Sequence, residues 1–108
     1  MGLDASVYLD DAEAEELASA RIGNSATVGY LAKIIAYRVP TASLLLTKVL
    51  YSGTHSGDRL PKEEVLLVKL ELADVKQRLA GDAAVVEFAS AFGPIVEAAL
   101  RHQRPIMF

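Results

Sequence analysis

Polar and apolar residues alternate at the start of the chain and then follow helical spacings through most of its length. Leu3, Ala5 and Val7 alternate with polar neighbours, which predicts a half-buried strand. Residues 12–20 are rich in Ala and Glu, so we expect a short helix there. The alternative is a second strand over residues 17–22, which would form a hairpin with the first.

Apolar residues then recur at intervals of three and four, which predicts amphipathic helices. We expect these helices to begin after Asn24, around residues 41–43, at Pro61 and after Asp82. Pro94 lies within the last of them and should kink it, because proline removes one backbone donor and crowds the preceding turn. The expected core residues are Val28, Leu31, Ile35, Leu45, Leu46, Val49, Leu50, Val65, Val68, Leu72, Val75, Leu79, Val85, Phe88, Phe92, Ile95 and Ala99.

Residues 104–108 are too few and too apolar for a free tail, so we expect them to run extended beside the N-terminal strand. The chain has 108 residues, a length that favours one domain. The predicted fold class is therefore α+β: one helix-rich domain, residues 1–108, of four to five helices. Its small sheet is formed by the N-terminal strand and the C-terminal extended segment.

Composition and charge narrow the classes of function. The formal net charge of −3 argues against nucleic acid or an anionic membrane surface as a partner. The absence of cysteine excludes disulfides, thiolate metal sites and a cysteine nucleophile. Asp4 stands where a secretory segment would carry Lys or Arg, and no apolar run reaches the roughly 20 residues that a bilayer requires. We therefore expect a soluble cytoplasmic protein.

The polar loop over residues 51–59 is the first candidate site, because it gathers hydroxyls, a histidine, a carboxylate and glycines between two predicted helices. One interpretation is a connector in which Gly53 stops one helix and Asp58 or Ser56 caps the next. A second is a surface that contacts a partner. A third is catalysis, with His55 as base, Asp58 as its orienting carboxylate and a nearby hydroxyl. The candidate residues are Tyr51, Ser52, Thr54, His55, Ser56, Asp58 and Arg59.

An acidic cluster over residues 10–16 is the second candidate, with Asp10, Asp11 and Glu13 as its leading members. It can serve as a patch for a basic partner. It can equally be a solvated face with acids in a first helical turn. The two histidines, His55 and His102, are far apart and lack a zinc-ligand spacing, so neither a metal nor a cofactor is predicted.

Four stretches together resemble small bacterial immunity proteins of polymorphic toxin systems. They are Met1–Asp4, Arg21–Asn24, Leu50–Asp58 and Pro105–Phe108. The resemblance implies a stoichiometric inhibitor that binds and occludes a cognate toxin, and it implies no catalytic residues. The modest negative charge departs from the strongly acidic balance expected of an inhibitor of a nucleic-acid-cleaving toxin, so the toxin class is open.

These observations favour a non-enzymatic protein-binding domain of the immunity type, with the polar loop and the acidic cluster as contact regions. The expected partner is a protein, such as a toxin domain, and a homodimer is left open. The alternative is a small enzyme or ligand-binding protein that uses His55 and Asp58. The two hypotheses differ in whether His55 lies in a cleft within hydrogen-bond reach of Asp58 and a hydroxyl.

Overall fold

The computed structural model describes residues 2–52 and 57–108 and shows an α+β fold with helices on one face of a sheet. The sheet has four antiparallel strands in the order β2-β1-β4-β3. Their bounds are β1 Gly2–Tyr8, β2 Glu16–Asn24, β3 Arg59–Leu60 and β4 Ile106–Met107. The helices are α1 Ser25–Arg38, the short π-helix η1 Leu45–Val49, α2 Lys62–Arg78 and α3 Ala83–His102.

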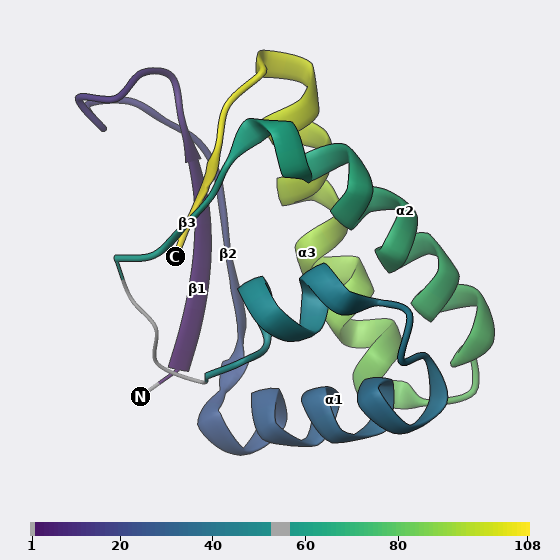
Figure 1. The fold of residues 1–108 in the computed structure, drawn as a ribbon. Helices are drawn as coiled ribbons and strands as arrows, with labels where there is room; N and C mark the ends of the chain where they lie inside the picture. The colour runs from purple at the N-terminus through teal and green to yellow at the C-terminus, as the bar shows by residue number, and fades with distance from the viewer. Residues whose placement is uncertain (1, 53–56) are drawn as a thin grey trace.

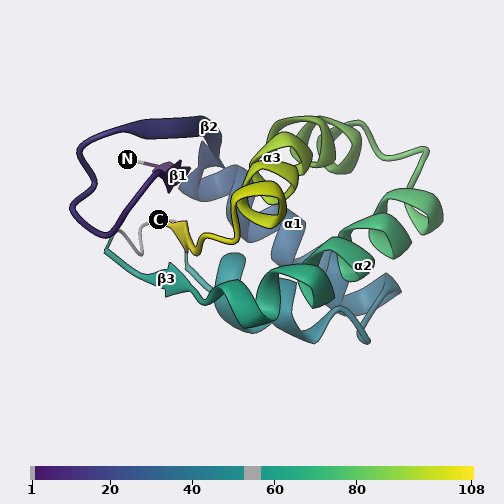
Figure 2. The same cartoon turned by 90° about the horizontal axis from the view of Figure 1, so that it is seen from above.

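One side of the sheet faces the helices and the other faces solvent (Figures 1 and 2). On β1, Leu3, Ala5 and Val7 are buried against the helices, whereas Asp4 lies exposed on the opposite side. This alternation follows from the two-residue period of a strand and confirms the half-buried strand predicted for the N-terminus. The solvent side of the sheet carries mostly polar side chains.

The helix expected over residues 12–20 is wrong, and the hairpin alternative is correct. Residues from Glu16 onward form β2, which pairs antiparallel with β1 from Gly2 opposite Asn24 to Tyr8 opposite Glu16. The helical preference of Ala and Glu amounts to only a few tenths of a kcal/mol per residue, so tertiary pairing overrides it. Because β1 would otherwise expose an unpaired edge, its pairing with β2 decides the conformation of this segment.

The C-terminal segment lies in the sheet, as expected. Met107 pairs with Ser6 of β1 on one side and with Arg59 of β3 on the other. The sheet is nevertheless larger than predicted, because both β2 and the two-residue β3 belong to it. The coarse prediction of an α+β fold with the N-terminal strand beside the C-terminal segment is therefore confirmed, and the predicted composition of the sheet was incomplete.

The helices form close to where their apolar spacing placed them. Asn24 caps α1 by accepting from the backbone N–H of Thr27 at 2.8 Å, and Asp82 caps α3 by accepting from Ala84 and Val85. Pro61 is the N-cap of α2, so that helix starts one residue later than expected. Helix α3 runs through Pro94 as one element. Every expected core residue is buried except Leu46, which is half-buried.

The segment after α1 departs from a regular helix. Residues 43–44 are α-helical, and the chain then widens into η1. The carboxylate of Glu71 on α2 accepts hydrogen bonds from the backbone N–H groups of Leu44 at 3.2 Å and Leu45 at 2.9 Å. These donors have no partner within their own helix, so Glu71 acts as a cap supplied from another element. Gly53, the expected end of this helix, lies outside the described residues.

Candidate functional site

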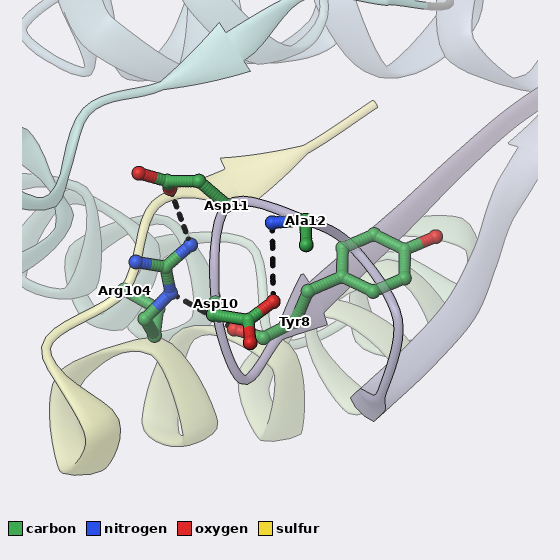
Figure 3. Close-up of polar contacts among 5 residues, drawn as sticks. All are labelled: Tyr8, Asp10, Asp11, Ala12 and Arg104. Atoms are coloured by element: carbon green, nitrogen blue, oxygen red, sulfur yellow. Dashed lines mark hydrogen bonds and ion pairs between the residues drawn. The ribbon is translucent and has the colours of Figure 1, made fainter.

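The acidic cluster occupies the turn of the β1–β2 hairpin, not the first turn of a helix. Asp10 holds the turn by accepting from the backbone N–H of Ala12 at 3.1 Å with its carboxylate and from that of Glu13 at 3.2 Å with its carbonyl (Figure 3). Glu13 adopts a positive φ of 56°, as tight turns often require. The interpretation of these acids as complements to a helix dipole is therefore wrong. Asp10 and Glu13 remain exposed and available to a partner.

Arg104 attaches this hairpin to the chain that follows α3 (Figure 3). Its Nε donates to the carbonyl of Tyr8 at 2.9 Å, and its second terminal nitrogen lies 2.7 Å from a carboxylate oxygen of Asp11. The Arg104 side chain is 20% exposed and that of Asp11 is 76% exposed. The hydrogen bond from Arg104, its charge and the charge of Arg59 lower the pKa of Asp11 below its usual value. Asp11 is therefore held ionised as part of the hairpin anchor.

A surface hollow of about 250 Å³ opens between this hairpin and the beginning of α2. Arg59 contributes to it from β3, so the structure brings together one residue of the polar loop and one of the acidic cluster. Two acids and three cations share its lining. The lining residues are Asp11, Arg59, Pro61, Lys62, Glu63, Gln103, Arg104 and Pro105.

The structure describes the polar loop at its two ends, residues 51–52 and 57–59. Tyr51 is exposed and Ser52 is half-buried, while Thr54, His55 and Ser56 lie outside the described residues. The chain re-enters at Gly57, whose N–H donates to the carbonyl of Phe108 at 2.6 Å. The arrangement of His55 with Asp58 and a hydroxyl therefore stays a prediction.

Asp58 does not cap the helix that follows it. Its carbonyl accepts from the N–H of Phe108 at 2.9 Å, and β3 then separates it from α2. Pro61 occupies the N-cap position, and within the described residues no side-chain capping hydrogen bond is found there. The connector hypothesis was thus wrong in naming Asp58 as the cap, because a strand follows it and not a helix, while Ser56, its other candidate, lies outside the described residues.

An apolar surface on α2 is a site that the sequence reasoning missed. Leu66, Leu67 and Leu70 are 55%, 54% and 60% exposed, and we call these three residues the leucine surface. They point away from the face that buries Val65 and Val68 and the later core residues of α2. The signal was present in the apolar run Val65–Val68 followed by Leu70, because a helix cannot bury four consecutive side chains on one face.

A metal site and a membrane-spanning helix are two further features to consider among the described residues. Within residues 2–52 and 57–108, no three His, Asp or Glu side chains lie together as a metal site would require. In the same ranges one helix, α3, is long and apolar enough to cross a bilayer. In this fold α3 is a core helix, with Phe88, Phe92 and Ile95 among its buried residues.

Comparison of the chain with protein-family models, with curated proteins and with solved structures found no match in any of the three.

Proposed function

We propose that the chain is a non-enzymatic protein-binding domain of the immunity type, which neutralises a cognate toxin by occlusion. The observation that carries the proposal is the leucine surface on the solvent side of α2. A helix on a globular core needs one apolar face, and α2 already has one. Contiguous apolar side chains left in solvent are a common mark of a protein interface.

The surroundings of the leucine surface also suit a protein partner. Lys62 and Glu63 line the hollow beside the hairpin, and Leu66 follows them by one helical turn. The hollow also contains the charged groups of Asp11 and Arg59. An apolar centre with a charged rim is the usual anatomy of a specific interface. Two of the predicted contact residues, Asp11 and Arg59, would then belong to this rim.

Burial of the leucine surface would contribute measurably to the affinity of a complex. Full burial of a leucine side chain contributes about 1.5–3 kcal/mol, and each of the three is more than half exposed. Their burial in a partner would therefore contribute roughly 3 kcal/mol, a factor of about a hundred in Kd. Occlusion of a toxin needs no reacting group, so such an interface would be enough for the proposed function.

The test is capture of a partner from the source cells with three versions of the protein. Leu66→Asp/Leu70→Asp removes the apolar centre, and Val86→Asp is the matched control because Val86 is an exposed apolar residue on α3. We expect wild type and Val86→Asp to retain the partner and the double variant to lose it. Circular dichroism must show that all three proteins are folded.

The immunity role requires a second readout. Expression of the captured partner alone should stop growth, and co-expression of wild type or Val86→Asp should restore it, whereas Leu66→Asp/Leu70→Asp should not. A partner that is harmless would contradict the immunity role but leave protein binding intact. Equal capture by the double variant would contradict the leucine surface, and a His55→Ala/Asp58→Ala variant would then show whether the polar loop is the contact instead.

A further inference from the structure

Strand β2 forms one edge of the sheet, and the sheet has no strand beyond it in the described part of the chain. The order β2-β1-β4-β3 leaves β2 with β1 as its single neighbour, and Figure 2 shows its outer side uncovered by the other described elements. It has nine residues, two more than β1, and contains neither proline nor lysine. Those residue types commonly protect edge strands from pairing, as do bulges, and β2 has register irregularities at Leu17 and Ile22. The regular edge that is open to another strand is therefore the stretch over residues 18–21 between them.

The residues of β2 are arranged symmetrically about Ser19. Ser19 lies opposite Ser6, while Arg21 lies opposite Asp4 and Glu16 opposite Tyr8. Asp4 and Tyr8 are each two residues from Ser6, so Arg21, two residues after Ser19, and Glu16, three residues before it, lie opposite equally spaced positions of β1. The irregularity between Val7 and Tyr8 places the extra residue on the β2 side and makes this symmetry possible.

We propose that two copies of the chain pair antiparallel through β2, across a two-fold axis at Ser19. The axis places Glu16 of each copy opposite Arg21 of the other, which gives two symmetry-related ion pairs, one on each side of the axis. The central stretch Ala18-Ser19-Ala20 reads the same in both directions, so Ala18 faces Ala20 and the two serines face each other. Such self-complementarity is what a two-fold interface requires.

The side chains involved are available for this pairing. Glu16, Ser19 and Arg21 are all exposed and share the solvent side of the sheet with Asp4. The guanidinium of Arg21 lies 3.7 Å from the carboxylate of Asp4, which is long for a direct hydrogen bond. In the monomer this guanidinium leans over β1 beside Gly2, and the side chain is 56% exposed, so it would turn outward to reach a second carboxylate across the axis. Each serine hydroxyl can donate and accept, so the central pair can satisfy itself.

This dimer is independent of the proposed function, because β2 and the leucine surface lie on different elements. The test is a charge exchange followed by sedimentation equilibrium. Glu16→Arg places arginine opposite Arg21 twice, and Arg21→Glu places glutamate opposite Glu16 twice. Each single variant should weaken dimerisation about tenfold, and the double variant Glu16→Arg/Arg21→Glu should restore it. Lys76→Glu on α2 is the control, since it changes the net charge as Arg21→Glu does.

The sedimentation and exchange results would support or overturn the proposed β2 dimer. A wild type that sediments as a monomer up to millimolar concentration would overturn the proposal. A dimer whose Kd is unchanged in Glu16→Arg would show that another surface is used. Glu16→Arg is the decisive single variant because, unlike Arg21→Glu, it leaves the Asp4–Arg21 pair intact. Slower hydrogen exchange of the amides of residues 18–20 at high protein concentration would support pairing through the edge of β2.

Discussion

Glu71 connects α2 to the start of η1, and its removal should destabilise the fold measurably. It accepts from the backbone N–H groups of Leu44 and Leu45. Leu45 is fully buried, so Glu71→Ala leaves its N–H without an acceptor, at a cost of about 1–3 kcal/mol. Leu44 is half-buried and adds less. We expect a total loss of about 2–3 kcal/mol, which corresponds to a fall in Tm of roughly 10 °C.

The assay is thermal unfolding followed by circular dichroism, with urea unfolding at 25 °C to obtain the free energy. Glu97→Ala is the matched control because it also replaces a helical glutamate, whose partner Lys69 lies 3.0 Å away on the surface. An exposed pair of this kind contributes about 0–1 kcal/mol. Glu71→Gln keeps an acceptor and should fall between the two. A Tm for Glu71→Ala within about 2 °C of that for Glu97→Ala would refute the capping role.

Two further predictions concern other contacts of the fold. The hydrogen bond from Tyr30 to Asp82, at 2.5 Å, lowers the pKa of Asp82 and raises that of Tyr30. The ionised carboxylate of Asp82 therefore stabilises the fold above the unfolded pKa of about 3.9, and this stabilisation is lost as pH falls through the lower folded pKa. In acid, the Tm of Asp82→Asn should therefore decline less with falling pH than the Tm of wild type. The stabilisation from the protonated Tyr30 hydroxyl is lost as pH rises through its raised pKa. The Tm of Tyr30→Phe should therefore lack this decline at alkaline pH. Arg104→Ala should cost about 1–2 kcal/mol, because the carbonyl of Tyr8 loses its donor, and hydrogen exchange in the hairpin should accelerate; an unchanged exchange rate would contradict the anchoring role.

The long helices were predictable from local sequence because their signals are local. The spacing of Val65, Val68, Leu72 and Val75 repeats every three or four residues, and all four are buried. Asp82 is a strong N-cap in any context, and it caps α3 here. Periodicity and caps require no knowledge of the rest of the chain, which is why these elements lie where they were expected.

Residues 12–20 were predicted wrongly as a helix, with the hairpin as the alternative, because the signal for the hairpin is not local. Ala and Glu over residues 12–20 favour a helix in isolation, yet Glu16 onward pairs with β1. Strand pairing depends on an edge that another segment offers, and propensity carries no information about that edge. The two-residue β3 was missed for the same reason, since Arg59 and Leu60 are a strand through their pairing with β4.

The candidate sites also combine residues that the sequence indicated with residues that only the fold brings to them. Residue types drew attention to Asp11 and Arg59, and the fold places both beside one hollow. The partner of Asp11 is Arg104, which lies 93 residues away and was not singled out. The leucine surface could have been found, because four consecutive apolar residues in a helix must include some that face solvent.

By itself, the amino-acid sequence determined the helices after residue 24, their buried faces, the caps at Asn24 and Asp82, and the extended C-terminal segment. The helices and caps depend on contacts within a few residues or on a simple period, whereas the C-terminal segment was inferred from its apolar composition and becomes a strand by pairing with β1 and β3. The tertiary structure alone decided that residues 16–24 are a strand, that Glu71 caps a helix on another element, and that Arg104 holds the hairpin. Those contacts join segments distant in sequence, and their free energy exists only once the sheet and the helices have packed together.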